Sequence, residues 1–457
     1  MKQVPYQNEY ADKSSHTDIV NNPDVKNFLE NCSFMKEPSQ DDIDEITNKF
    51  IEVTTTEVNS PQNIISIDGS YYEASVRKEI PCTRVGYVKV GNLLIKRNDF
   101  YSLKGNTNFV NPFKVAALKE NNSSVTFAFP SSNMKYKDEE NVRDSFRRAL
   151  DETLCEIRTN PKDPKTSLRS TLFLLSSYRG DGNTRNKMIL FKCPTCNAEK
   201  IEVMDVEGTQ RCPHCNNKIY PSDCLRIWEE VSDSVSNQSA LNRFMNVIEH
   251  IFPIHYMRVV KDANPQSYID ILNNVCFFID GPLAIFGNAA WVHNSIKKFL
   301  SELNSEMRDH NKRDIMILGL QKSGYVYDYF QLINKHIKNN TIYCLEDDFR
   351  YKYILFEGKS VGKSFGDETY YGQDFLYKSN SGKIFVFDIP YDYIDEKNRF
   401  DINNYENLNV YLNIIQDFEC DLYENAVIPI ALAHKYTAIS LEPGGKVLDL
   451  LSKTITN

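Results

Sequence analysis

Two aspartates, each followed by glycine, lie more than two hundred residues apart, and each ends a largely apolar run. Asp68 follows residues 63–67, and Asp280 follows residues 275–279. Apolar runs that stop at a glycine turn are typical of buried strands, so we expect each acid at a strand end. Carboxylates on two separate strands are the minimum scaffold for two Mg²⁺ or Mn²⁺ ions that clamp the oxygens of a phosphodiester. Each Asp-Gly pair taken alone is better explained as an ordinary strand-to-turn aspartate.

Three further residues are candidates for the same site. Glu249 lies near the end of an amphipathic helical pattern just before the second aspartate, where a third carboxylate would complete a two-metal cage. His434 ends an apolar, small-residue helical stretch, and its imidazole could ligate a metal or transfer a proton. Lys322 follows a buried strand and could contact the scissile phosphate. The alternative interpretations are a helix-surface glutamate, a satisfied core histidine and a plain loop lysine.

Four cysteines form a second motif. Cys193, Cys196, Cys212 and Cys215 make two C-x2-C pairs separated by fifteen residues. Four thiolates at this spacing can close a tetrahedron around Zn²⁺ and leave no open position for substrate, so we predict a structural zinc ribbon. Cys224 is an alternative ligand, although a fifth thiol is more easily explained as a bystander. Free or redox cysteines are the other interpretation of this spacing.

Length and composition indicate a globular protein. A chain of 457 residues exceeds what one hydrophobic core usually supports, so we expect one large domain with insertions or two to three units. No apolar run approaches the roughly 18 residues that a membrane span needs, and the polar first 22 residues lack a signal-peptide core. We therefore expect a cytoplasmic protein without membrane association, whose eleven cysteines are reduced or metal-bound.

The charge balance narrows the kind of nucleic-acid protein that this chain can be. A formal net charge of −9 excludes a protein that binds nucleic acid simply as a polycation. It does not exclude a nuclease, because a metal-dependent active site is itself acidic. Local basic clusters at Lys297-Lys298 and residues 308–313 could contact a phosphate backbone, although such clusters are more often solvated helix faces.

The apolar periodicity predicts a mixed α/β sheet. Early strands are expected as a meander at residues 63–67, 85–90, 93–95 and 125–129. Later strands at residues 275–279, 314–320 and 383–389 alternate with helical patterns. The predicted helices span residues 139–157, 170–176, 234–251, 289–310, 326–337, 405–418 and 426–440.

Four segments are expected along the chain. Residues 1–60 form a polar, acidic arm with one helix near residues 41–51. Residues 61–185 and 226–457 are expected to form the two parts of the main domain. The zinc ribbon, residues 186–225, is inserted between them.

Taken in chain order, these motifs resemble the NurA nuclease family. The matching segments are residues 67–70, Glu249, residues 278–283, residues 320–323 and residues 433–434. The resemblance covers about residues 61 to 445 and is interrupted by the four-cysteine insertion, which the simplest members of the family lack. The chain departs from the family at residues 425–429, where NurA proteins often have tyrosines.

This resemblance implies an RNase H-like mixed sheet flanked by helices and Mn²⁺- or Mg²⁺-dependent cleavage of DNA. It implies that Asp68, Glu249 and Asp280 bind the metal. His434 would act beside them as a ligand or proton-transfer group, and Lys322 would join them. The resemblance also implies a homodimer and a partner, a hexameric HerA-type ATPase that feeds DNA to the nuclease, in repair or in defence against invading DNA. The alternative is a catalytically inactive NurA-like adaptor that binds DNA or the translocase through its zinc ribbon.

Overall fold

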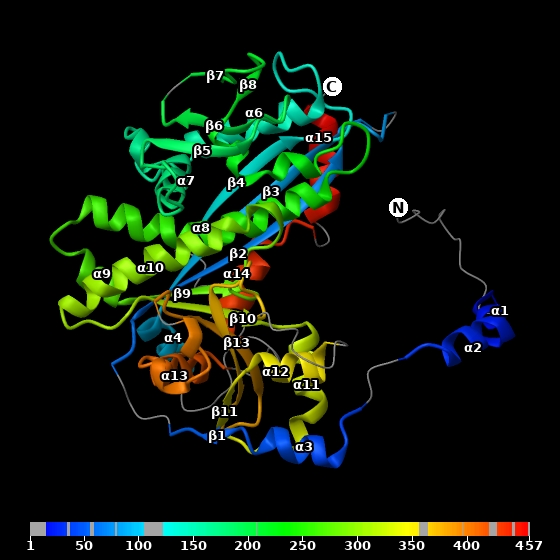
Figure 1. Cartoon of the computed structure of the whole chain (residues 1–457), viewed down its shortest axis with the longest axis vertical. Coiled ribbons are helices and arrows are strands. Elements are labelled where there is room, and N and C mark those ends of the chain that lie inside the picture. The colour runs from blue at the N-terminus through cyan, green and yellow to red at the C-terminus, as the bar shows by residue number, and fades with distance from the viewer. Residues whose placement is uncertain are drawn as a thin grey trace.

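A nine-stranded mixed sheet is the centre of the molecule (Figure 1). The structure is a computed structural model. The strand order of this sheet is β1-β11-β12-β13-β10-β9-β2-β3-β4. Strand β9 is parallel to both β2 and β10, and the other neighbouring pairs are antiparallel. The described residues are 15–33, 37–54, 59–77, 80–104, 122–206, 208–355, 364–394, 396–419, 427–440 and 444–455.

The sheet is built from strands of very different length. Its members are β1 (Ile51–Glu52), β2 (Asn63–Ser75), β3 (Arg84–Lys96), β4 (Asn122–Pro130), β9 (Val275–Asp280), β10 (Met316–Gln321), β11 (Thr341–Cys344), β12 (Gly372–Lys378) and β13 (Ile384–Pro390). Two small hairpins lie outside it, β5 (Lys187–Lys192) with β6 (Glu199–Met204) and β7 (Gln210–Arg211) with β8 (Lys218–Ile219). A large mixed sheet flanked by helices, as predicted, is therefore confirmed.

Helices precede, flank and follow the sheet. Those before β9 are α1 (Ser15–Asn21), α2 (Pro23–Glu30), α3 (Gln40–Thr47), α4 (Arg97–Lys104), α6 (Val142–Glu156), α7 (Leu168–Ser177), α8 (Gln238–Ala263) and α9 (Tyr268–Asn273). Those after it are α10 (Trp291–Asp309), α11 (Tyr325–Ile333), α12 (Asp347–Phe349), α13 (Leu408–Phe418), α14 (Ile428–Thr437) and α15 (Gly444–Ile455). Figure 1 shows α8 crossing the long strands β2 and β3.

Both faces of the central strands are buried because neighbouring residues along them are apolar. On β2, Ile65 and Ile67 pack in one core cluster with α8 residues such as Phe244. Ile64, which points to the other face, packs in a second cluster with α13 and α14. A third cluster joins α3 and α11 to the β11–β13 part of the sheet. Two layers of helices thus enclose the sheet and leave its strand ends for the site.

Two glycines in β2 and β3 lie within strands, so the turns predicted there are wrong. β2 continues past Asp68-Gly69 to Ser75, and β3 continues through Gly91 as one strand. A Cβ at Gly69 would lie 2.6 Å from Met245 Cγ, and a Cβ at Gly91 would lie 2.6 Å from Thr437 Cγ2. The absence of a side chain at Gly69 therefore lets α8 approach β2, and the absence of one at Gly91 lets α14 approach β3. The prediction for Asp280 holds, because β9 ends there and Gly281 has a φ of +111°.

Several elements were not predicted from the sequence. These are β1, β11, β12, α1, α2, α4, α9, α12 and α15. The one helix expected near residues 41–51 is α3, and the chain then enters β1. β12 was not predicted because its buried polar residues, Gln373, Asp374 and Lys378, interrupt the apolar pattern of a buried strand. The helix predicted at residues 234–251 starts at Gln238 and continues to Ala263.

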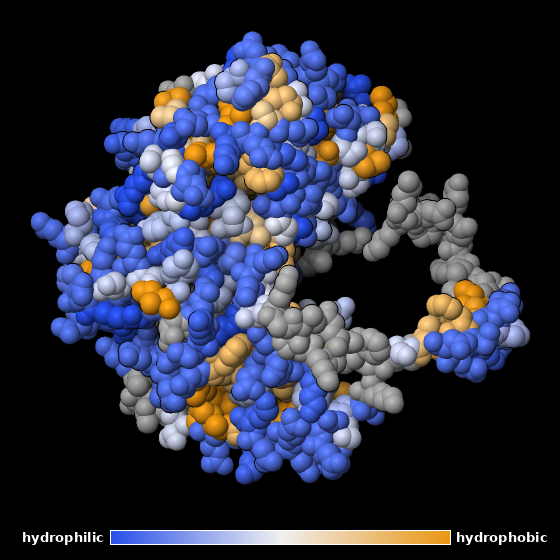
Figure 2. All heavy atoms as spheres, in the orientation of Figure 1, coloured by the Kyte–Doolittle hydropathy of each residue, from blue (hydrophilic) through white to orange (hydrophobic). Residues whose placement is uncertain are grey.

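The visible surface is mostly hydrophilic. Figure 2 shows apolar side chains on this face in small, separate patches rather than one continuous area. Among the described residues, none of the helices combines the length and apolar character needed to cross a bilayer.

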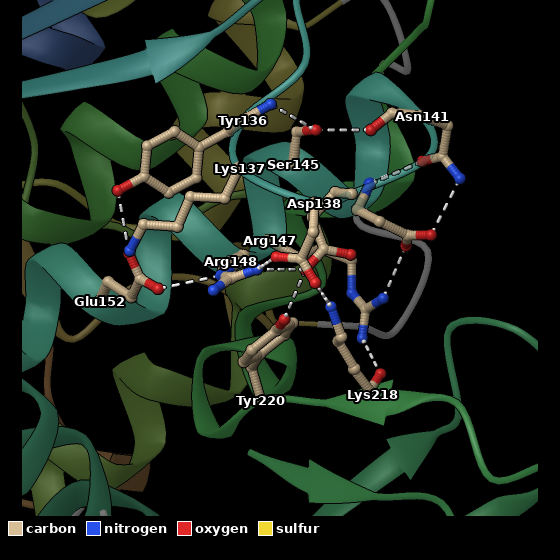
Figure 3. Close-up of polar contacts among 12 residues, drawn as sticks. Tyr136, Lys137, Asp138, Asn141, Ser145, Arg147, Arg148, Glu152, Lys218 and Tyr220 are labelled. Carbon is tan, nitrogen blue, oxygen red and sulfur yellow. Dashed lines mark hydrogen bonds and ion pairs between the residues drawn. The ribbon is translucent and has the colours of Figure 1, made fainter. Parts of the chain in front are cut away.

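The two hairpins with the four cysteines, here called the four-cysteine module (residues 187–219), are fixed to α6 by charged side chains. Figure 3 shows Arg147 and Arg148 of α6 beside Lys218 and Tyr220 of the module's last strand and its continuation. Arg147 donates to the carbonyl oxygen of Lys218 at 2.9 Å and pairs with buried Asp223 at 2.6 Å. The Lys218 ammonium lies 3.1 Å from Asp138. The module is thus anchored by a network whose central pair is buried.

Asp151, also on α6, gives this anchor a measurable pH dependence. Burial raises the pKa of Asp151 to about 6. Its Oδ1 accepts from the Ser222 backbone N–H at 3.0 Å, and Arg169 lies 3.6 Å from Oδ2. Because the folded-state pKa is raised, this proton stabilises the folded protein fully below about pH 4, and the stabilisation is lost as the pH rises through about 6.

We expect Asp151→Asn to remove this part of the pH dependence, because the amide keeps the acceptor for Ser222 and stays neutral. The stability of the variant relative to the parent should rise by about 3 kcal/mol between about pH 4 and pH 7. Chemical unfolding of both proteins at the two pH values measures this difference. Asp262→Asn, at an exposed position of α8, is the control. A variant curve parallel to that of the parent would contradict the prediction.

Candidate active site

The site lies where β2 and β9 separate. Their parallel pairing ends with Ile67 opposite Ile279, and β9 stops one residue later while β2 continues. Asp68 and Asp280 are the next residues on the two strands, and a carboxylate oxygen of one lies within 4.8 Å of a carboxylate oxygen of the other. The gap between the strands therefore places the two predicted aspartates side by side.

Helix α14 brings His434 to this gap. Gly91 is paired with Asp68 across β2 and β3, and its lack of a side chain lets Thr437 of α14 approach. The Thr437 hydroxyl donates a hydrogen bond to Asp68 Oδ2. His434 Nδ1 lies 3.5 Å from Asp68 Oδ2 and 3.9 Å from Asp280 Oδ2. The hydrogen bond to Asp68 raises the pKa of His434, although partial burial opposes it.

Helix α8 brings Glu249 from the other face of the sheet. A Cβ at Gly69 would lie 2.8 Å from Glu249 Oε1, so glycine makes room for this carboxyl group. Glu249 is only 6% exposed and is thus a buried residue that faces the sheet. Burial, followed by the charges of Asp68 and Asp280, raises the pKa of Glu249 well above its usual range. The third predicted carboxyl group therefore shares the electrostatic environment of the first two.

Lys322 completes the predicted set. It directly follows β10, and its Nζ lies 2.5 Å from Asp280 Oδ2. Burial, with a smaller contribution from Asp68, raises the pKa of Asp280 to about 6, while Lys322 acts in the opposite direction. All five residues predicted for one site, Asp68, Glu249, Asp280, His434 and Lys322, are brought together by the structure.

These residues surround a cavity of about 320 Å³. Its lining residues are Asp68, Gly69, Asn242, Arg243, Met245, Asn246, Glu249, Asp280, Phe286 and His434. Five further residues at the site were not predicted from the sequence, namely Asn242, Arg243, Asn246, Phe286 and Thr437. Asn242, Asn246 and Glu249 are spaced four and three residues apart, which puts polar groups on one side of a largely apolar helix. That spacing was the signal that could have identified them.

The donor set at the cavity fits a divalent metal. Asp68, Asp280 and His434 each offer a ligand atom within 4.8 Å of the other two. Carboxylate oxygens with an imidazole nitrogen are ligands that Mg²⁺ and Mn²⁺ accept. Mutual repulsion contributes to the raised pKa values of Glu249 and Asp280, and a bound divalent cation would relieve it.

The four-cysteine module contains a second group of potential metal ligands. The sulfur atoms of Cys193 and Cys215 are 3.7 Å apart, and those of Cys196 and Cys212 are 3.8 Å apart. A tetrahedral zinc ion with Zn–S bonds of about 2.3 Å requires sulfur separations of about 3.8 Å. The cluster therefore fits a zinc site. Cys224, the alternative ligand, is buried and lies outside this group.

A mixed sheet that, with its flanking helices, gathers carboxyl groups and a histidine around an open cavity where two strands separate is typical of a metal-dependent hydrolase. The sequence model of the NurA domain matches residues 62–439, which is most of the chain. The chain belongs to the NurA domain family, whose members are nucleases, and it is of nuclease type.

Two solved structures were compared with the chain. The NurA nuclease from Sulfolobus solfataricus has 10% identity and a TM-score of 0.33, with 97% of this chain and 96% of that chain covered. A second NurA crystal structure has 11% identity and a TM-score of 0.30, with 97% of each chain covered. A search of curated proteins gave no match. The family assignment therefore rests on the domain match.

Gly69→Ala should impair activity much more than stability. The added methyl group meets Met245 Cγ and Glu249 Oε1, so it shifts Glu249 relative to Asp68. Displacement of a catalytic group by about 1 Å can cost on the order of 100-fold in rate, and we expect a loss of that size in kcat. Steady-state cleavage and thermal unfolding measure the two effects. The control is Gly86→Ala, which meets Leu241 of the same helix away from the carboxyl groups. Equal rates in the two variants would contradict the prediction.

Proposed function

We propose that the chain is a divalent-metal-dependent DNA nuclease that cleaves phosphodiester bonds beside a hexameric HerA-type ATPase, in DNA end processing or in defence against invading DNA. The observation that carries this proposal is the convergence of three carboxyl groups from β2, α8 and β9 at one cavity, beside His434 of α14. Membership in the NurA family supports the same conclusion.

Asp68, Glu249 and Asp280 would hold Mn²⁺ or Mg²⁺. When bound, such a metal supplies a Lewis acid and lowers the pKa of a water molecule. His434, half exposed beside Asp68, would hold or transfer a proton there. Lys322, paired with Asp280 at 2.5 Å, would turn its charge toward the scissile phosphate.

The four-cysteine module would bind a structural zinc ion through Cys193, Cys196, Cys212 and Cys215. Four cysteine ligands leave no open position on zinc, so the module would act by contact with DNA or with the ATPase. We further propose that the module, within residues 186–225, divides the NurA-like domain into residues 61–185 and 226–457, and that two copies of the chain form a homodimer.

The alternative is a catalytically inactive adaptor that binds DNA or the translocase through the module. It would be favoured if Glu249 or His434 pointed away from the two aspartates. Glu249 lines the same cavity as Asp68 and Asp280, and His434 Nδ1 is 3.5 Å from Asp68. The geometry therefore supports the nuclease over the adaptor.

The test is cleavage of labelled single-stranded DNA, double-stranded DNA and RNA of the same sequence by the purified, zinc-loaded protein. Each reaction is run with Mn²⁺, with Mg²⁺ and with a chelator, in the presence and absence of the ATPase. We expect metal-dependent cutting of DNA that is lost in Asp68→Asn. Folded, zinc-loaded protein that cuts nothing under any of these conditions would support the adaptor.

A further inference from the structure

A buried charged cluster lies behind Asp280 and has no part in the chemistry above. Asp374 and Asp388, on neighbouring strands, are 1% and 0% exposed, and Arg350 is 5% exposed. Arg350 donates to Asp374. Burying charged groups is costly unless they are paired and hydrogen-bonded. Each member of this cluster therefore needs hydrogen-bond partners.

The cluster holds the turn that follows Asp280. Asp388 Oδ2 accepts a hydrogen bond from the Leu283 backbone N–H at 2.7 Å. On its other side, the carbonyl oxygen of Leu283 accepts from the backbone N–H of Tyr371 at 2.9 Å. The Tyr371 hydroxyl lies 2.7 Å from Nδ1 of His250, which is the residue after Glu249. The turn is thus fixed on both sides and is linked to α8.

Gln321 connects the same cluster to Lys322. Its side-chain Nε2 donates to Asp388 at 2.8 Å and lies 3.2 Å from Asp374 Oδ1. Gln321 is the last residue of β10 and directly precedes Lys322, which pairs with Asp280. One carboxyl group, that of Asp388, therefore contacts the segments that carry both members of the Asp280–Lys322 pair.

The sheet is shaped to let the turn fold back over it. Gly319 of β10 is paired with Asp388, and a Cβ there would lie 2.7 Å from the carbonyl oxygen of Gly281. A Cβ at Gly372 would lie 2.7 Å from Leu283 Cβ. Because Gly319 and Gly372 have no side chains, the turn can approach the strand on which Asp388 lies.

We propose that Asp388 is a positioning residue that fixes the turn at residues 281–283 and, through Gln321, the start of the loop with Lys322. This inference rests on the proposed nuclease function. Asp388 shares one face of β13 with Ile384 and Val386, which are apolar core residues. Packing alone would be served by another apolar side chain, whereas only an acceptor satisfies the Leu283 N–H.

The two aspartates of the cluster have opposite pKa shifts. Burial, together with Asp374, raises the pKa of Asp388 well above its usual range. Arg350 lowers the pKa of Asp374, although burial opposes it. Both oxygens of Asp388 accept hydrogen bonds, Oδ2 from the Leu283 N–H and Oδ1 from Gln321 Nε2, as a positioning role requires.

Three variants test the proposal. Asp388→Ala removes both acceptors, Asp388→Asn keeps an oxygen for Leu283 but puts an N–H where an oxygen accepts from Gln321, and Ile384→Ala removes only buried apolar volume from the same face. The readouts are kcat and KM for the DNA that the parent cleaves, Mn²⁺ affinity by calorimetry, thermal unfolding, and amide hydrogen exchange at residues 281–284.

We expect Asp388→Ala to lower kcat on the order of 100-fold with little change in KM, because the reacting groups lose their alignment. Mn²⁺ affinity should weaken, and exchange at residues 281–284 should accelerate. Asp388→Asn should keep slow exchange at the turn and recover part of kcat, because it retains the acceptor for Leu283 but not the one for Gln321. Ile384→Ala should lower the unfolding temperature while its kcat and its exchange at the turn stay at the parental level.

The inference is overturned if Asp388→Ala cleaves like the parent, if Ile384→Ala loses kcat equally, or if exchange at the turn is unchanged. Failure of the proposed function has a different signature, in which the parent itself cleaves nothing. In that case the exchange measurement still decides whether Asp388 holds the turn.

Discussion

Asp280→Asn should lower kcat/KM for DNA cleavage on the order of a thousandfold, which is the effect of removing several kcal/mol of transition-state stabilisation. The amide carries no charge for a divalent metal, and it also leaves Lys322 without the carboxylate that lies 2.5 Å from its Nζ. Asp68→Asn should have an effect of the same size, because the carboxylate of Asp68 lies within 4.8 Å of that of Asp280 and would bind the same metal. Cleavage rates at saturating Mn²⁺ measure both losses.

These losses should not come from unfolding. Each side chain acts through charge rather than through packing, so circular dichroism and thermal unfolding should show an intact fold. Asp270→Asn, at an exposed residue of α9 that pairs with Lys312, makes the same chemical change outside the site. If both site variants kept parental cleavage, the assignment of the metal ligands would be wrong.

The second large effect is expected in the four-cysteine module. Cys212→Ser should abolish stoichiometric zinc and unfold residues 187–219, because zinc contributes on the order of 10 kcal/mol to the folding of such small modules. The hairpin of β7 and β8 has strands of only two residues each, so few backbone hydrogen bonds would hold it without the metal. Zinc analysis of the purified protein and limited proteolysis measure the two outcomes.

Cys224→Ser is the matched control for this prediction. Cys224 is buried close by, but it is not among the four cysteines whose sulfur atoms meet. This variant should retain one zinc ion per chain and a protease-resistant module. Loss of zinc from Cys224→Ser, with retention in Cys212→Ser, would show that the ligand set is different.

The sequence was most informative where apolar periodicity continued without interruption. β9, β10, α6 and α10 were predicted to within a few residues, because each buries a regular face. β12 was missed since buried Asp374 and Lys378 find partners far away in the chain, Arg350 and the carbonyl oxygen of Asn334 among them. A pattern along one segment cannot reveal such partners.

The site was predicted unevenly for a similar reason. Asp68 and Asp280 were marked by the residues beside them, whereas the helical patterns around Glu249 and His434 also fitted a surface glutamate and a core histidine, and the order of motifs along the chain favoured the site. Gly69 was interpreted as a turn, because its purpose, the approach of α8, depends on a helix almost two hundred residues later. Thr437 carried no local signal at all.

The distance along the chain between Asp68 and Thr437 has a consequence for how the protein is made. The hydrogen bond between them spans 369 residues, and His434 lies on the same late helix. A growing chain can form β2, β3 and β9 and bury Glu249 long before α14 has left the ribosome. The histidine joins the acids only after residues 428–437 have emerged. A cell that makes this protein therefore meets the completed site only in chains that have been translated past α14.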